Sequence, residues 1–183
     1  PKTIDNENRV GRYTSCAIAD NNTVWISYYD ASNGNLKVVR RLPTGVNPWQ
    51  PSETVDGNDA AKNENVGEYT SCAIADDGTL WISYYDKTNG ALRAVNRPPN
   101  GPWQQPETVD NGGGISGNNV GTHTSLAISD NNTIWISYYD STNGDLKAAH
   151  RLPGGQWQYE TVDGCSTGET GNCDDVGTFS SIA

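Results

Sequence analysis

An all-β fold made of repeated antiparallel sheets is predicted by three features of the sequence. The six residues Trp-Ile-Ser-Tyr-Tyr-Asp occur at 25–30, 81–86 and 135–140, which indicates a repeat of roughly 55 residues. Short apolar runs alternate with Gly, Asn, Asp and Pro, without the 3.6-residue period of a helix. The composition, with 20 Gly, six Trp, nine Tyr and no Met, is typical of many short strands joined by turns.

Each repeat contains four candidate strands. In the first repeat they are Thr-Ser-Cys-Ala-Ile-Ala-Asp, then Thr-Val-Trp-Ile-Ser-Tyr-Tyr-Asp, then Asn-Leu-Lys-Val-Val-Arg-Arg-Leu, and finally a segment running from a Trp to Glu-Thr-Val-Asp. Asp-Asn-Asn or Asp-Asp-Gly links the first two strands. The Asn-Gly pairs at 33–34, 89–90 and 143–144 predict a tight hairpin with positive φ between the second and third.

The second strand is apolar on both of its faces. Val24, Ile26 and Tyr28 alternate with Trp25, Ser27 and Tyr29. A strand covered on both faces belongs in a sheet packed between two other sheets. Four-stranded antiparallel sheets stacked radially meet this requirement, so the sequence predicts a β-propeller.

The repeats divide the chain into three complete blades and two partial ones within a single domain, 1–183. We place the blades at 10–65, 66–119 and 120–175, with the end of a preceding blade at 1–9 and the start of a following one at 176–183. Propellers close with about four to eight blades, so we expect a fragment of a longer propeller. The alternative is that open sheet edges join neighbouring chains into a ring or filament.

The recurring Ile-Ser-Tyr-Tyr-Asp word, followed by Asn-Gly and Leu-Lys, resembles the propeller repeats of bacterial and archaeal surface proteins over the whole chain. The resemblance implies a secreted or cell-attached propeller and no single activity. Residues 130–135 also resemble the Asp-box turn of sialidase-type propellers, with Asn132 at the Gly place and the Thr one residue early. Sialidase catalytic residues are therefore not carried over to this chain.

The chain is acidic, with a formal charge of −10 from 22 acidic and 12 basic residues. Such a charge repels phosphate backbones and anionic lipid, which disfavours nucleic acid and membrane surfaces as partners. No apolar run approaches the roughly 18 residues of a membrane helix. We expect an extracellular or cell-surface protein whose partners are protein or carbohydrate.

The four cysteines fall in two settings. Cys165 and Cys173 bracket a Gly-rich loop and are predicted to form a disulfide, which favours an oxidising compartment. Cys16 and Cys72 occupy equivalent repeat positions that hold Leu126 and Ile182 elsewhere. We expect these two to be small core residues.

Two kinds of binding site are candidates. The loops that connect successive blades are rich in the oxygen ligands that calcium prefers, and the candidate ligands are Asp56, Asp59, Asp174 and Asp175; plain solvated loops are the alternative. A Trp opens each fourth strand, at Trp49, Trp103 and Trp157. These rings suit stacking on sugars, and packing between blades explains them equally well.

Other polar positions carry weaker signals. Asn21 and Asn131 begin N-glycosylation acceptor patterns on the turn between the first and second strands. His123 stands where the other repeats hold Tyr13, Tyr69 and Phe179, so we expect it to fill an aromatic-sized space. The Asp residues that end the second and fourth strands are expected to cap strand ends and turns.

No catalytic set stands out from the repeat, because carboxylates repeated identically on every blade do not offer the two different environments that acid–base catalysis needs. We therefore expect a non-enzymatic extracellular propeller module for binding or scaffolding. The alternative is a structural subunit of a surface layer or filament completed by neighbouring chains. A carbohydrate-active enzyme is the least favoured of the three.

Overall fold

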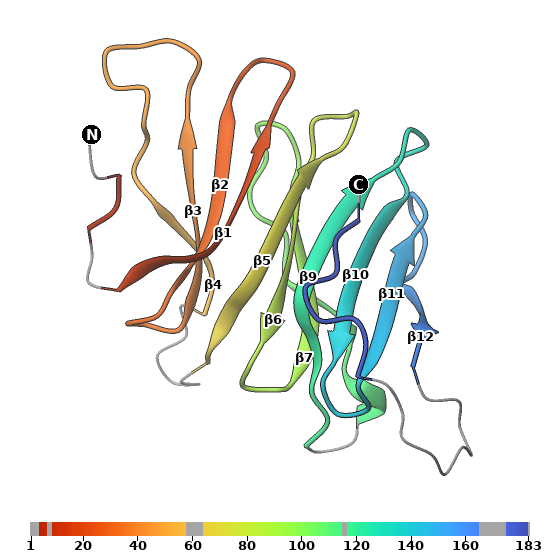
Figure 1. Cartoon of the computed structure of the whole chain (residues 1–183). Coiled ribbons are helices and arrows are strands. Elements are labelled where there is room, and N and C mark those ends of the chain that lie inside the picture. The colour runs from red at the N-terminus through yellow and green to blue at the C-terminus, as the bar shows by residue number, and fades with distance from the viewer. Residues whose placement is uncertain (1–3, 7–8, 58–63, 115–116, 165–174, 183) are drawn as a thin grey trace.

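The chain forms three four-stranded antiparallel sheets that stack side by side as blades of a β-propeller (Figure 1). The structure, a computed structural model, describes residues 4–6, 9–57, 64–114, 117–164 and 175–182. The first blade contains β1 (Val10–Ile18), β2 (Val24–Asp30), β3 (Asn35–Arg41) and β4 (Glu53–Asp56). The second contains β5 (Val66–Ile74), β6 (Leu80–Asp86), β7 (Ala91–Arg97) and β8 (Glu107–Asp110). The third contains β9 (Val120–Ile128), β10 (Ile134–Asp140), β11 (Asp145–Arg151) and β12 (Gln158–Asp163).

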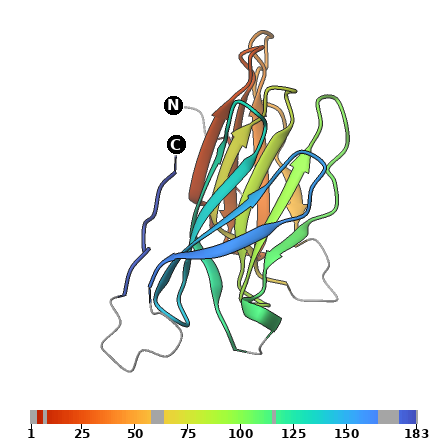
Figure 2. The same cartoon turned by 90° about the vertical axis from the view of Figure 1, so that its right-hand side faces the viewer.

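Strand order follows chain order in every blade, so each blade is a meander of hairpins. The first strands of successive blades pack against each other, β1 on β5 and β5 on β9, and form the inner side of the stack (Figures 1 and 2). A 3₁₀ turn, η1 (Gly112–Gly114), precedes β9. Within the described ranges no helix has the length and hydropathy needed to cross a membrane.

The hydrophobic core lies between the blades. One cluster joins Leu36 and Val38 of β3 to Leu80, Ile82 and Tyr84 of the second blade. Ile82 and Tyr84 are fully buried, because the sheets on both sides cover the strand. The repeated Trp-Ile-Ser-Tyr-Tyr-Asp word is therefore the wedged strand of each blade, as its two apolar faces predict.

Polar contacts also join the blades at equivalent places. The Tyr84 hydroxyl donates a 2.6 Å hydrogen bond to Asp56 at the end of the preceding blade, and Arg93 lies 3.0 Å from the same carboxylate. The set recurs as Tyr138, Lys147 and Asp110, and as Tyr28, Lys37 and Asp5. Asp56 and Asp110, which end strand four, accept backbone N–H groups of the following turn, as expected of caps. In addition, they bridge consecutive blades.

Glycine permits a close approach between an inner strand and the third strand of the preceding blade. Gly121 begins the inner part of β9 with φ 101°, and a Cβ there would lie 2.6 Å from the Cα of Leu92 in the preceding blade. Gly67 and Gly177 approach the preceding blade in the same way. A side chain at these positions would push two sheets apart.

The Asn-Gly turns differ in one respect from the tight hairpin we expected. Asp30 pairs with Asn35 across a four-residue loop, and within the Asn33-Gly34 pair only Gly34 has positive φ, at 70°. The Asn33 amide instead donates a 2.8 Å hydrogen bond to Asp30. Asp30 also accepts backbone N–H groups of the loop, so it caps the turn as predicted.

The division of the chain ends into partial blades stays a prediction. Residues 175–182 run along the inner side of the third blade, where the backbone N–H of Ile182 donates to Ser125 of β9 (Figure 2). Leu126 and Ser71 make the same contact one blade earlier. Of the two cysteines expected in the core, Cys72 is buried and Cys16 is exposed. The difference arises because β1 has no described blade in front of it.

Candidate functional site

The inner strands carry a column of four aromatic rings. Each inner strand holds one ring at the same height: Tyr13, Tyr69, His123 and Phe179. Ring centroids of successive members are 4.5, 4.5 and 4.4 Å apart. Tyr13 and Phe179 at the ends of the column are exposed, and the two middle rings are half-buried. We call these four residues the aromatic column.

A β-bulge creates the column. In β1 the pairing skips from Arg12 opposite Tyr29 to Ser15 opposite Ser27, so two residues of the inner strand oppose one of the second strand. All four column residues adopt left-handed φ angles, between 53° and 58°. Bulky residues rarely adopt this conformation, which costs of order 1–3 kcal/mol and is concentrated at functional sites.

A second layer of tyrosines supports the column. Tyr29, Tyr85 and Tyr139 of the second strands lie with ring centroids 6.1, 6.4 and 6.2 Å from column residues. Their hydroxyls donate to Asn65, Asn119 and Asp175, respectively, at the start of the next inner strand or segment. The column is thus held on a hydrogen-bonded layer.

The repeats differ in charge next to the column. The residue before each ring is Arg12, Glu68, Thr122 or Thr178. Glu68 is largely buried, and its carboxylate lies 3.1 Å from the ammonium group of the exposed Lys87. Thr122, at the equivalent place in the next blade, has a buried hydroxyl with no hydrogen-bond partner in the described structure. This face is therefore asymmetric although the fold is repetitive.

Electrostatics at the column favour neutral rings. Burial, followed by a hydrogen bond with Tyr13, raises the pKa of Tyr69 to about 12. Burial lowers the pKa of His123, so its imidazole is neutral at pH 7 and can both donate and accept a hydrogen bond. The hydrogen bond to Asp175, followed by burial, raises the pKa of Tyr139 to about 12.

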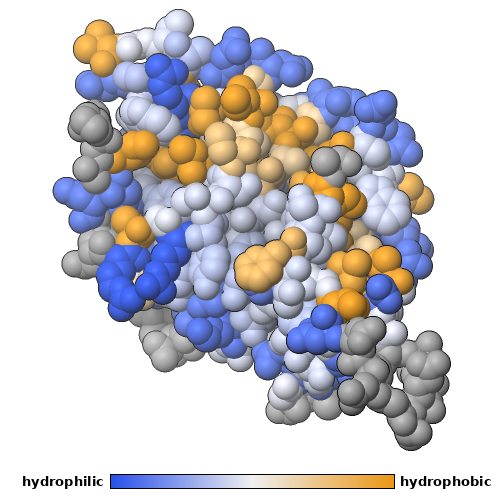
Figure 3. Space-filling model, viewed as in Figure 1, coloured by the Kyte–Doolittle hydropathy of each residue, from blue (hydrophilic) through white to orange (hydrophobic). Residues whose placement is uncertain are grey.

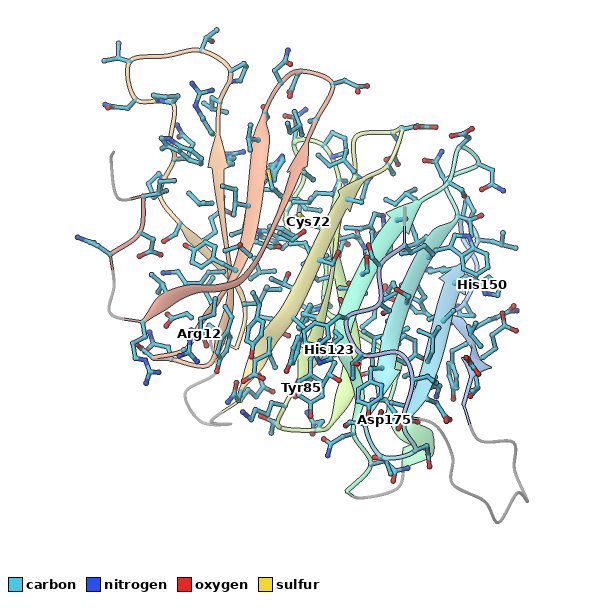
Figure 4. All side chains as sticks on the ribbon, in the orientation of Figure 1. Arg12, Cys72, Tyr85, His123, His150 and Asp175 are labelled. Carbon is cyan, nitrogen blue, oxygen red and sulfur yellow. The ribbon has the colours of Figure 1, made fainter. Side chains whose placement is uncertain are left out.

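Figure 4 labels Arg12, Tyr85, His123 and Asp175, which lie toward the end of the blades opposite the β1–β2 turn. The surface above the inner strands is mostly of intermediate hydropathy, with apolar groups toward the β1–β2 turn end (Figure 3). Aromatic faces together with hydroxyl, amide and carboxylate groups form a surface that suits a hydroxylated ligand with apolar C–H faces. Sugars have this character.

The predicted calcium ligands are not brought together among the described residues. Asp56 binds Tyr84 and Arg93, and Asp175 accepts the hydroxyl of Tyr139. Asp59 and Asp174 lie outside the described residues. Within the described ranges, no group of three His, Cys, Asp or Glu side chains could hold a metal ion. The calcium site stays a prediction, as does the Cys165–Cys173 disulfide, whose cysteines also lie outside the described residues.

The predicted sugar-stacking tryptophans lie between blades. The indole N–H of Trp103 donates to Glu53 of the preceding blade, and its ring packs edge-on against Trp25. Trp157 repeats both contacts, with Glu107 and Trp81. Trp49 precedes β4 and is half-buried. Ligand binding by these three rings stays a prediction.

The two predicted glycosylation acceptors have a structural role in their turns. Asn21 and Asn131 each accept the backbone N–H two residues later, from Thr23 and Thr133. Asn22 and Asn132 follow them with φ 60°, and Gly78 at the equivalent place has φ 80°. The Asn-for-Gly exchange noted in the Asp-box-like turn thus preserves a left-handed backbone. Glycosylation itself stays a prediction.

Sequence reasoning missed most of this face. Tyr13, Tyr69 and Glu68 were not singled out, and His123 was expected to be a filler of aromatic size. One available signal was that the two positions after Val-Gly are the ones where otherwise near-identical repeats change chemistry. The bulge itself left no such signal: the structure shows inner strands of nine residues against seven in the second strands, and the predicted first strand was shorter.

Comparison with solved structures supports the β-propeller fold. No family model and no curated protein matches the sequence. Among solved structures, the polysaccharide lyase Uly1 aligns with a TM-score of 0.61 and 12% identity, over 82% of this chain and 40% of the lyase. The Hadza microbial sialidase Hz136 aligns with a TM-score of 0.56 and 12% identity, over 83% and 37%.

The exo-β-1,3-galactanase 1,3Gal43A from Clostridium thermocellum is also similar, with a TM-score of 0.52 and 12% identity over 77% of this chain and 34% of the galactanase. The chain thus spans about two fifths or less of the length of these enzymes. Our expectation of a non-enzymatic module is contradicted, because the three similar structures named above are a lyase, a sialidase and a galactanase. The expectation took the repetition of carboxylates as evidence against catalysis and overlooked the asymmetric inner face.

Proposed function

We propose that the chain is part of a carbohydrate-active enzyme that acts on glycans outside the cell, with its substrate bound across the aromatic column. The observation that carries the proposal is this column, strained into left-handed backbone beside the charged positions of Arg12 and Glu68. The named neighbours, a lyase, a sialidase and a galactanase, support the substrate class.

Sugar rings stack their C–H faces on aromatic side chains, and the column offers four such rings at a nearly constant spacing. The neutral imidazole of His123 and the hydroxyl of Tyr69 supply hydrogen bonds to sugar hydroxyls. A saccharide of several units is the ligand that matches an extended aromatic surface.

Hydrolysis of a glycosidic bond, the reaction of most glycosidases, uses two carboxyl groups on either side of the bond. Glu68 is the only acidic residue on β1, β5 and β9, and Asp175 begins the next inner segment. We place Glu68 in the reaction as one carboxyl group, held in position by Lys87. Asp175 is the candidate for the second.

The test is an activity screen of the intact protein on β-1,3-galactan, sialylated glycans and acidic polysaccharides, with release of reducing ends or unsaturated sugars as readout. Glu68→Gln is expected to lower kcat by about a hundredfold or more with little change in KM. Tyr69→Gly is expected to raise KM, because it removes a ring and keeps the backbone. Glu160→Gln on the exposed β12 is the matched control.

Activity on one substrate class that survives in Glu160→Gln and is lost in Glu68→Gln would support the proposal. Full activity in Glu68→Gln, with folding verified by circular dichroism, would contradict the role of Glu68. If the protein cleaves a glycan and removal of column rings does not change the kinetics, the substrate binds outside the aromatic column.

A further inference from the structure

Two pockets lie at the end of the blades away from the aromatic column, beside the turns that join the first and second strands of the blades. The pocket between the first and second blades has a volume of about 420 Å³ and is lined by Trp25, Arg40 and Arg97 together with turn residues. We call it the Trp25 pocket. An equivalent hollow of about 320 Å³ between the second and third blades contains Trp81, Asn96 and Arg151.

Part of the lining is the same in both pockets. Arg97 from the second blade lies over the Trp25 ring, 5.4 Å from its centroid, and Arg151 lies 5.6 Å from the Trp81 centroid. Arg97 is paired with Glu53 at 2.9 Å, and Arg151 with Glu107. These contacts belong to the junction between blades, so the charges of both arginines are already balanced.

One lining position varies between the blades. In the strand pairing, Arg40 lies opposite Trp25, Asn96 opposite Trp81 and His150 opposite Trp135. The same position thus carries a cation, a neutral amide and an imidazole. Figure 4 shows His150 on the third blade, well apart from His123 of the column.

Within the part of the chain that the structure describes, Arg40 is a cation without a counter-ion. Its guanidinium lies 5.5 Å from the Trp25 centroid, its Nε is buried without a hydrogen-bond partner, and among the described residues it forms no ion pair. His150 at the equivalent place also has a buried nitrogen, Nδ1, without a partner. An unpaired arginine in a pocket of a chain with charge −10 is a site for an anionic group.

The pocket rim selects the kind of anion. Asp20, Asp76 and Asp77 line the same pocket and are exposed, so their carboxylates repel a doubly charged anion such as sulfate more strongly than a singly charged carboxylate. The same carboxylates, with the amides of Asn21 and Asn100, accept and donate hydrogen bonds to hydroxyl groups. The lining therefore matches a ligand whose single carboxylate is attached to a hydroxyl-bearing ring.

We propose that the Trp25 pocket binds an acidic sugar, with Arg40 holding its carboxylate and the aspartate rim contacting its hydroxyls. The sugar class rests on the proposed function, whereas the recognition of a carboxylate rests on Arg40 alone. The site lies at the opposite end of the blades from the aromatic column, so it holds a different part of a glycan from the one that is cleaved.

The blades themselves supply the test variants. Arg40→Asn gives the Trp25 pocket the residue found in the next pocket, and Asn96→Arg does the reverse. Calorimetric titration of the intact protein with glucuronic acid, glucose and inorganic sulfate is the measurement. We expect glucuronic acid to bind one equivalent through Arg40, with glucose and sulfate at least about tenfold weaker.

Arg40→Asn is expected to weaken glucuronic acid binding about tenfold or more, and Asn96→Arg to add a second equivalent of binding. Unchanged affinity in a folded Arg40→Asn variant would overturn the proposal. Equal binding of sulfate would also overturn it by indicating an adventitious ion only, and equal binding of glucose would remove the role of the carboxylate.

The two proposals fail separately. Arg40-dependent binding of glucuronic acid in a protein that cleaves no glycan would retain this pocket and refute the proposed function. Glycan cleavage that depends on Glu68, in a protein that does not bind glucuronic acid, would retain the function and refute the pocket. Asn96→Arg lies outside the aromatic column and is expected to leave cleavage unchanged.

Discussion

Tyr84 and Asp56 lie in different blades, and the tyrosine hydroxyl donates a 2.6 Å hydrogen bond across the junction to the carboxylate. Tyr84 is fully buried, and burial, followed by the negative charge of Asp56, raises its pKa. The hydroxyl therefore stays protonated and available as a donor. Every junction between described blades repeats this contact. Removing it therefore tests how much the junction contributes to stability.

Replacing Tyr84 with Phe is expected to lower the free energy of unfolding by about 1–3 kcal/mol, because Asp56 loses a donor in a buried place. Urea denaturation followed by tryptophan fluorescence is the measurement. Tyr159→Phe is the control, since Tyr159 is 49% exposed and is expected to change stability by less than about 0.5 kcal/mol. Equal effects of the two substitutions would show that the junction hydrogen bond adds no stability.

Lys147 and Asp110 form a buried ion pair at 2.6 Å. Lys147→Met is expected to cost about 3–5 kcal/mol, because it leaves the fully buried Asp110 carboxylate without its cation. Adding Asp110→Asn to Lys147→Met should restore part of this loss, since the stranded charge is removed. A double variant whose loss equals the sum of the two single losses would contradict the coupling.

Alkaline pH should weaken the fold through its tyrosines. The pKa of Tyr69 rises from 10.0 to about 12 on folding, so the folded state holds this proton more tightly than the unfolded state. The resulting stability is complete below pH 10.0 and is lost as pH rises toward about 12. Unfolding free energies measured across this range should fall, and Tyr69→Phe should flatten the decline. An unchanged decline in Tyr69→Phe would show that other titrating groups cause the loss of stability at alkaline pH.

The left-handed backbone of the column can be tested at His123, where φ is 54°. Both His123→Ala and His123→Gly remove the ring, but only Gly adopts this φ without strain. We expect the Gly variant to be more stable than the Ala variant by about 1 kcal/mol, the reverse of the usual order in a strand. Thermal unfolding measures the stability of the two variants. An Ala variant more stable than the Gly variant would mean that the backbone at this position leaves the left-handed region.

The approach of an inner strand to the third strand of the preceding blade can be tested at Gly121, where a Cβ would lie 2.6 Å from the Leu92 Cα. Gly121→Ala should destabilise the protein by about 2 kcal/mol or more through overpacking and strain. Gly11→Ala is a matched control, because Gly11 has positive φ at the same repeat position but no atom within 4 Å. The difference between the two losses of unfolding free energy gives the cost of the steric contact with Leu92, because both variants carry the backbone strain. Equal losses would show that the whole cost comes from the positive φ.

The propeller could be predicted from the second strand of each repeat. Residues 24–29 alternate apolar side chains on two faces, and burial on both faces requires sheets on both sides. Register and strand order follow from turns of few residues. The exposure of Cys16 could not be predicted from its own repeat, because burial there depends on a neighbouring blade that precedes β1.

The inner face was less accessible to sequence reasoning. Tyr13 and Thr14 together oppose Tyr28, and simple alternation along the strand does not predict this bulge. The contact between Asp56 and Tyr84 joins residues from two repeats, so examining each repeat alone suggests only local capping. Glu68 was overlooked because the comparison of repeats considered the carboxylates that recur in every repeat. Glu68 occurs at a position where the other repeats have a different residue.

Because each junction joins the end of one repeat to the middle of the next, a deletion that begins and ends at equivalent codons removes one junction and leaves a matched one. Recombination between repeats would therefore change the protein by whole blades, with Tyr, Asp and a cation meeting again at the new seam. A deletion of any other length would bring unlike surfaces together. The junctions therefore favour changes of chain length by whole blades.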